Sequence, residues 1–223
     1  MKRLAPILGL LALAYSLADA AAIESVREQE IRECRSGEVT TWGDGQDRPV
    51  VSATLSFTYN PVDAPSGFPA AQVAGMVTRA AEAWAQCGVP IQILAWPAAA
   101  KQDVVVVQWS EKDSNGNFGQ VHLGRRKLSL GPSAFELLRT RNPRHDAGET
   151  LQLVISHEMG HFFGLMAHSR RCVDVLSYYH NEKGEQCYSR DPSQLRSVPE
   201  YRHILPTACD IVRCRAANGK PPL

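Results

Sequence analysis

The chain is organised around VISHEMGHFFG, residues 154–164, which His168 follows closely. His157 and His161 stand four positions apart with Glu158 directly after the first, which is the H-E-x-x-H pattern. Because an α-helix turns once every 3.6 residues, side chains four apart lie one above the other on one face. Both imidazoles can therefore point at one metal ion, with the glutamate close enough to accept a proton from a water molecule there. The pattern indicates metal-assisted hydrolysis.

The residues around the motif predict the helix that should carry it. Apolar residues recur at spacings of four, four and three and form a core-facing stripe, namely Leu151, Ile155, Met159 and Phe162. Gly164 comes where the helix should end, because glycine readily adopts the left-handed conformation that closes a helix. Chance matches to the motif usually fall in polar loops, so the helical context favours a metal site.

The sequence after the helix resembles the metzincin zinc metallopeptidases, whose motif continues through a glycine to a third histidine. Here Gly164 is followed by Leu-Met-Ala and then by His168-Ser169, which is similar to the matrixin branch but one residue longer. The resemblance implies that His157, His161 and His168 bind Zn²⁺.

The inserted residue departs from the family pattern and leaves alternatives for the third ligand. A loop tolerates one extra residue far better than a helix does, so we expect a bulge before His168. Otherwise Asp174, His180 or a later glutamate could supply the third bond to the metal.

Residues 174–179, DVLSYY, resemble the Met-turn, the tight turn beneath the metal in metzincins. Leu176 stands where the methionine would be, and leucine can fill a similar apolar volume. Tyr178, two residues later, matches the tyrosine that astacins and serralysins move between metal and substrate. The resemblance therefore implies a catalytic role for Tyr178, although a tyrosine after a turn is just as often a packing residue.

Periodicity predicts the elements before the motif. Alternating residues indicate a strand over 52–59, an apolar stripe indicates a helix from Ser66 to about Cys87, and further strands are expected at 91–94, 103–109, 121–123 and 127–130. This order resembles the N-terminal half of a metzincin domain, in which the antiparallel edge strand borders the cleft. Either Lys127–Leu130 or Val121–Leu123 would be that strand.

The resemblance implies an α+β zincin fold, with a mixed twisted sheet and two main helices above an irregular, disulfide-stapled lower subdomain. We expect a signal peptide from its basic start, apolar run and small-residue end, then a polar extension without chemistry of its own. The expected segments are 1–20, signal peptide; 21–49, extension; and 50–223, metallopeptidase domain, divided into 50–164 and 165–223.

Six cysteines, all after the predicted signal peptide, predict three disulfides in an oxidising compartment. Short separations favour Cys172–Cys187 and Cys209–Cys214, which leaves Cys34–Cys87. An unpaired Cys34 could instead cap the zinc as an inhibitory thiolate, as in the pro-segments of some matrixins. A short helix is expected near Gln194 or over 207–212.

Together these features predict a secreted, monomeric zinc endopeptidase that acts on a protein or peptide, with Glu158 as general base. The net charge of +1 gives no reason to expect nucleic acid, and we expect no membrane anchor. One alternative is a gluzincin-like peptidase in which Glu182 or Glu185 replaces His168. Another is an inactive secreted zinc-binding module. The remaining histidines are expected to be structural or exposed: His122, His145, His180 and His203.

Overall fold

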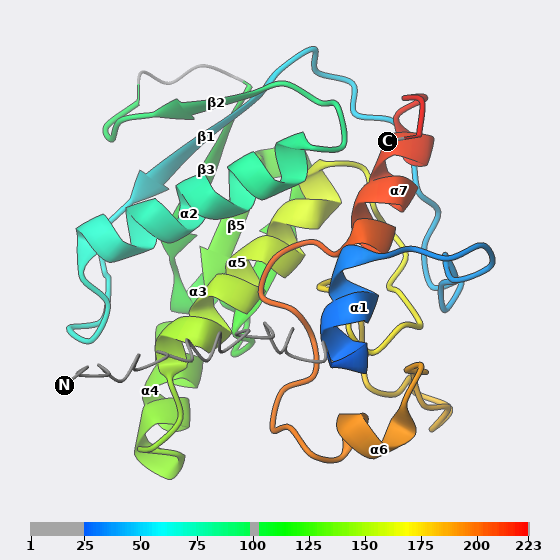
Figure 1. The fold of residues 1–223 in the computed structure, drawn as a ribbon. Helices are drawn as coiled ribbons and strands as arrows, with labels where there is room; N and C mark the ends of the chain where they lie inside the picture. The colour runs from blue at the N-terminus through cyan, green and yellow to red at the C-terminus, as the bar shows by residue number, and fades with distance from the viewer. Residues whose placement is uncertain (1–24, 99–102, 223) are drawn as a thin grey trace, which may run out of the picture.

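The computed structural model describes residues 25–98 and 103–222 (Figure 1). The predicted signal peptide and the first residues of the polar extension lie outside this range. Within it, no helix combines the length and the apolar character that crossing a membrane would need.

A five-stranded sheet forms the centre of the fold, in the order β2-β1-β3-β5-β4. Its strands are β1 (Leu55–Asn60), β2 (Ile91–Leu94), β3 (Val104–Trp109), β4 (Gly119–His122) and β5 (Lys127–Leu130). All neighbours run parallel except β4 and β5, which are antiparallel. With its flanking helices this mixed sheet is consistent with an α+β fold.

The antiparallel edge strand is β4, which overlaps the segment expected at Val121–Leu123. The alternative, Lys127–Leu130, is wrong because β5 pairs with β3 on one side and with β4 on the other. Both segments are four-residue strands, so their own sequences do not determine which one has a partner on both sides.

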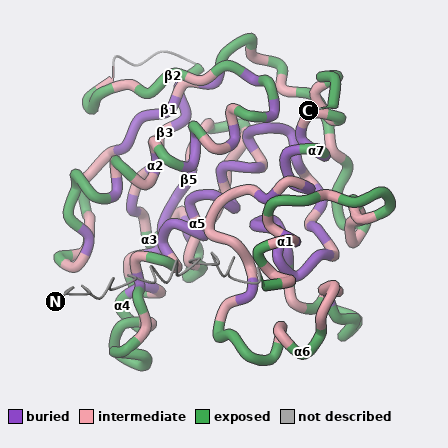
Figure 2. The backbone as a smooth tube through the Cα atoms, in the orientation of Figure 1, coloured by how far each residue is buried: buried purple, intermediate pink, exposed green. Residues whose placement is uncertain are grey.

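Two long helices, α2 (Ala70–Ala85) and α5 (Ala147–Phe162), pack together against the sheet (Figure 1). The predicted stripe of α5 is buried, and the Trp84 Nε1–H of α2 donates to the Ser156 carbonyl at 2.8 Å. Figure 2 shows burial concentrated in α5 and the central strands, whereas α6 (Pro192–Leu195) has no buried residue. The predicted motif helix therefore lies in the core.

Shorter helices complete the chain: α1 (Val26–Arg32), α3 (Glu111–Ser114), the 3₁₀ turn η1 (Leu123–Arg125), α4 (Pro132–Arg141) and α7 (Ala208–Ala217). The short helix expected near Gln194 or over 207–212 is present at both places, as α6 and α7, whereas α4 was not predicted. Helix α4 begins with proline in its first turn and buries only Phe135, so its apolar pattern is too short to be recognised.

The disulfides are Cys34–Cys209, Cys87–Cys214 and Cys172–Cys187, so two of the three expected pairs are wrong. Cys209 and Cys214 both lie on α7, where a separation of five turns their side chains about 140° apart. Each instead pairs with a distant cysteine. The idea of an unpaired, inhibitory Cys34 is wrong for the same reason, because that sulfur is bonded to Cys209.

The polar segment before β1 packs along the chain that follows α5. Trp42 N–H donates to the His168 carbonyl and Arg48 N–H to the Gly164 carbonyl, each at 3.0 Å. Gly164 has the left-handed φ of +96°, and a Cβ there would lie 2.1 Å from the Arg48 carbonyl oxygen. The segment is thus fixed against the loop that ends at His168.

Candidate metal centre

The structure brings His157, His161 and His168 together. Their ring centroids are 5.5 Å apart for the helical pair, 5.1 Å for His157 and His168, and 5.2 Å for His161 and His168. One nitrogen from each ring lies within 4.8 Å of those of the other two. This proximity allows the three rings to act as ligands of one ion.

Each histidine uses its Nδ1 in a hydrogen bond. His157 Nδ1–H donates to the Val175 carbonyl at 2.8 Å, and His161 Nδ1–H to the Leu165 carbonyl at 2.7 Å. His168 Nδ1 lies 2.7 Å from Asp44 Oδ2. Because a carbonyl and an ionised carboxylate only accept, these contacts favour the proton on Nδ1 and leave the Nε2 lone pair for a metal.

Burial favours the neutral, ligand-competent form of these rings. It lowers the pKa of His161 to about 4 and also lowers the pKa values of His157 and His168. The donor set, the tautomers and the spacing therefore fit Zn²⁺, which neutral imidazole nitrogens bind well.

The loop with the extra residue is held from the polar N-terminal segment. Asp44 Oδ1 accepts the His168 N–H at 2.9 Å, in addition to the contact between its Oδ2 and the ring. Asp47 Oδ1 accepts Met166 N–H at 2.8 Å and Ala167 N–H at 3.2 Å, and Arg213 pairs with the same carboxylate. Two aspartates thus hold the loop in the course that brings His168 to the other histidines.

Glu158 lies between the histidine pair and the edge strand. Burial raises the pKa of its carboxyl to about 7, against the effect of a hydrogen bond from the Val121 backbone. A Cβ at Gly119 would lie 2.8 Å from Glu158 Cγ and 2.5 Å from Val154 Cγ1. The glycine in β4 therefore leaves the space that this glutamate occupies.

The segment that resembles a Met-turn forms a tight turn, in which Ser177 N–H donates to the Asp174 carbonyl at 3.0 Å. Leu176 is fully buried, and a Cβ at Gly160 of α5 would lie 3.0 Å from its Cδ1. The carbonyl of Val175 is the acceptor for His157. The turn thus packs beneath the metal-site helix and orients one of its histidines.

The Tyr178 ring stacks on His168, with 3.9 Å between centroids and 23° between planes. It remains 40% exposed and lines the same cleft as the histidines. Burial is the main reason why the pKa of its hydroxyl rises to about 12, which keeps the group a hydrogen-bond donor at neutral pH.

A cleft of about 1070 Å³ contains the three histidines, Glu158 and Tyr178. One side of the cleft is β4 with the residues just before it, and another is the end of α4 with the α4–α5 loop. Glu200 and Arg202, from the segment between α6 and α7, also border the cleft. The candidate site residues therefore line one common cleft.

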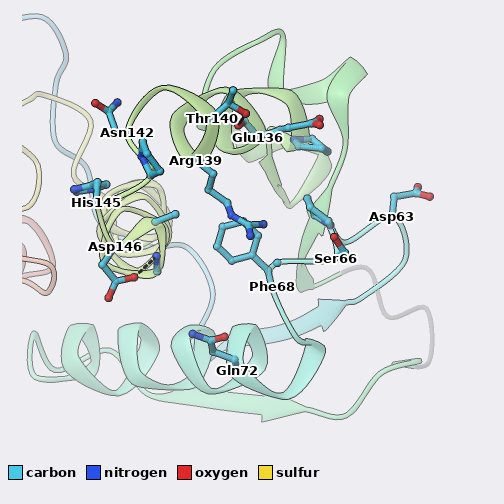
Figure 3. Close-up of a pocket in the computed structure, with 16 residues that line it drawn as sticks. Asp63, Ser66, Phe68, Gln72, Glu136, Arg139, Thr140, Asn142, His145 and Asp146 are labelled. Carbon is cyan, nitrogen blue, oxygen red and sulfur yellow. Dashed lines mark hydrogen bonds between the residues drawn. The ribbon is translucent and has the colours of Figure 1, made fainter.

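Figure 3 shows a neighbouring cavity of about 790 Å³ between α4, the start of α5 and the turn before α2. It shares Asn142, Pro143 and His145 with the cleft. None of the candidate site residues, all of which lie in the described part of the chain, lines it. The candidate site is therefore the cleft and not this cavity.

The alternative ligands lie in other surroundings. Asp174 is buried and bonded to Ser169, Arg171 and Thr207, and His180 pairs with Gln186 in a β-bridge. Glu182 and Glu185 are exposed. Among the described residues, a second cluster of possible ligands contains Cys34, Glu38 and Cys209, but its two sulfurs are bonded to each other.

The other histidines have protein partners. His122 contacts the Asp113 carbonyl, His145 the Thr150 hydroxyl, and His203 the Leu205 carbonyl. Sequence reasoning missed Asp44 and Asp47, whose short acidic side chains in a glycine-containing loop give no local signal of a contact more than 100 residues away.

Comparisons with known proteins leave the family open. No protein-family model matches the chain, and no curated protein matches it. Among solved structures, a chain of the GM1-bound form of the ECX AB5 holotoxin is similar, with 14% sequence identity and a TM-score of 0.46. The match covers 76% of this chain and 81% of that one, and it is too weak to carry an argument about function.

Proposed function

We propose that this protein is a secreted zinc-dependent endopeptidase of metzincin type. The observation that carries the proposal is the convergence of three imidazole rings, each with its Nδ1 hydrogen-bonded, beside a buried glutamate in an open cleft. The disulfides are consistent with an extracellular protein. The tight turn under α5 and the antiparallel edge strand support the metzincin assignment.

His157, His161 and His168 would hold the ion. Zinc, when bound, supplies Lewis acidity that polarises a scissile carbonyl and makes a water molecule acidic near neutral pH. Glu158 takes the proton of that water and later delivers it to the leaving amine. Burial raises the pKa of this carboxyl to about 7, which suits a group that must both accept and release a proton near neutral pH.

Two further groups would act on the substrate. Tyr178 keeps its proton to high pH, so its hydroxyl can donate to the oxygen that gains charge during attack on the carbonyl. The free edge of β4 can pair with an extended peptide backbone, which brings the scissile bond across the histidines.

The test is hydrolysis of unfolded casein by purified protein, with and without a chelator, beside the Glu158→Gln variant. We expect the wild type to cleave casein, the chelator to stop it, and the variant to keep its zinc while it loses nearly all hydrolysis. Cleavage by Glu158→Gln at the wild-type rate would contradict the mechanism. A zinc-loaded wild type that cleaves nothing would favour the inactive binding module.

Replacement of the third ligand separates the two peptidase alternatives. His168→Ala should lose zinc by elemental analysis, because Glu182 and Glu185 lie on an exposed segment. Unchanged zinc content, with metal lost from Glu182→Gln or Glu185→Gln instead, would favour the gluzincin-like arrangement.

A further inference from the structure

We propose that the substrate carries acidic residues on the C-terminal side of the scissile bond, where they meet Arg141 and Arg144. This inference rests on the proposed peptidase function and names the class of peptide it would select. The course of β4 determines the direction in which a substrate would cross the cleft.

The edge strand β4 runs along the cleft in the same direction as α5. Just before it, Phe118 lies against Phe135 of α4 with 5.0 Å between ring centroids. Just after it, Leu123 lines a small cavity together with His161, near the end of α5. The strand therefore begins at the α4 side and ends at the His161 side.

A peptide that pairs with β4 in the more stable antiparallel sense runs the opposite way. Its N-terminal part lies toward His161, and the residues after the scissile bond lie toward α4 and the α4–α5 loop. Both Arg141 and Arg144 line this end of the cleft.

The charge at this end is positive. The side chains of Arg141 and Arg144 are exposed, and the ion pairs between described residues include neither of them. Besides Glu158, the carboxylate on the cleft wall is Glu200, which Arg202 neutralises through contacts of 2.9 Å and 2.8 Å. A peptide carboxylate would supply the missing partner of the two free guanidinium groups.

A third arginine on the same helix has a different environment and provides a control. In Figure 3 Arg139 points toward Phe68 in the neighbouring cavity, and its guanidinium carbon lies 6.0 Å from that ring centroid. It does not line the cleft. Arg139→Glu and Arg141→Glu therefore change the charge by the same amount, two residues apart. Arg139 lies outside the cleft, whereas Arg141 lines it.

The experiment uses quenched-fluorescence decapeptides built on one casein sequence that the enzyme cleaves. They carry Asp-Asp, Asn-Asn or Lys-Lys after the cleaved bond, and a second series carries the same pairs before it. We expect kcat/KM for Asp-Asp after the bond to exceed that for Lys-Lys by roughly tenfold, with the difference reduced by added salt. Arg141→Glu with Arg144→Glu should reverse this order, and Arg139→Glu should retain it.

Equal kcat/KM for the acidic and basic peptides, or a preference confined to the N-terminal series, would overturn the proposal. Fluorescence anisotropy of the same peptides, labelled and mixed with zinc-loaded protein, separates this failure from failure of the peptidase. If no peptide is cleaved, tighter binding of Asp-Asp than of Lys-Lys, lost in the double variant, still supports the acidic site. Equal binding removes it.

Discussion

Asp44 is the residue on which the position of the third histidine depends most directly, since one carboxylate contacts both the ring and the backbone N–H of His168. Partners of this kind orient a ligand and raise its basicity, and their loss typically costs about 10-fold to 100-fold in metal affinity. We expect Asp44→Ala to weaken zinc binding by that factor, measured by competition with a coloured chelator.

The matched control is Asp63→Asn, which removes one negative charge from a residue that lines the neighbouring cavity and not the cleft. It should leave the zinc affinity unchanged. An Asp44→Ala protein that binds zinc as tightly as the wild type would show that the loop holds His168 without this carboxylate.

Asp210 supports the turn beneath the candidate metal site, because its Oδ2 accepts the N–H of Val175 at 2.9 Å and the carbonyl of Val175 accepts from His157. Burial is the main cause that raises the pKa of Asp210 to about 7, and repulsion by the nearby Asp174 carboxylate adds to it. An acid whose folded pKa is raised stabilises the fold at pH below its unfolded pKa, about 3.9, and this stabilisation is lost as pH rises through about 7. The Asp210→Asn variant should lack this contribution to the pH dependence.

Urea unfolding of metal-free protein between about pH 5 and pH 8 measures this effect. The free energy of unfolding of the wild type should fall relative to that of Asp210→Asn as pH rises. The comparison between the two proteins cancels other groups that titrate in this range, such as Glu158. Parallel curves would mean that Asp210 titrates alike in the folded and unfolded chain.

At the residue scale, the sequence predicted what is local. His157, Glu158 and His161 are recognisable because one helical turn brings them together. His168 follows in the loop directly after that helix. Asp44 and Asp210 contribute just as directly to the geometry, but only the tertiary fold brings them there. No local pattern marks a carboxylate that will accept a hydrogen bond from a distant loop.

At the scale of elements, the contact between β4 and α5 determines where Glu158 can point. The Cβ of Gly119→Ala would lie 2.8 Å from Glu158 Cγ and 3.2 Å from its Oε1, so the glutamate must move. Since a displacement near 1 Å can cost on the order of 100-fold in rate, we expect kcat to fall by about that factor while zinc content is unchanged.

Gly124→Ala is the control for this prediction, because a Cβ at Gly124 meets nothing within 4 Å and the residue follows β4 closely. Its kcat should match that of the wild type. Full activity in Gly119→Ala would mean that Val154 yields and that the position of Glu158 tolerates the change.

Helices and strands with a clear repeat of apolar residues could be predicted from the sequence. Elements whose place depends on the strands or helices beside them could not. Helix α5 buries its stripe, and the valine-rich β3 lies inside the sheet, as their sequences indicated. The roles of β4 and β5 depend on strand pairing, which four residues cannot encode alone. Helix α4 was missed, although its last turn borders the cleft.

For the whole molecule, disulfides connect distant parts of the chain that meet at the candidate metal site. Cys34–Cys209 closes a separation of 175 residues and Cys87–Cys214 one of 127. The chain-entropy relation gives each bond an upper value of about 5 kcal/mol, because loop length enters only as a logarithm. Removing either bond should therefore lower the free energy of unfolding by a similar amount.

The two bonds differ in what they hold. Cys34–Cys209 attaches the segment that carries Asp44 and Asp47 to α7, whose Arg213 pairs with Asp47. We expect the double variant Cys34→Ser with Cys209→Ser to lose zinc affinity as well as stability. Cys87→Ser with Cys214→Ser should lose similar stability and keep more of its zinc affinity, since that bond joins α7 to the end of α2.

Zinc titration of both double variants, at a temperature where each remains folded by circular dichroism, distinguishes the two effects. A larger loss of zinc affinity in the Cys34–Cys209 variant means that the N-terminal segment is part of the metal site. Equal affinities would mean that the hydrogen bonds of Asp44 and Asp47 hold the loop without the covalent bond. In that case the polar segment would depend on its own contacts with residues 164–170, which include three backbone hydrogen bonds.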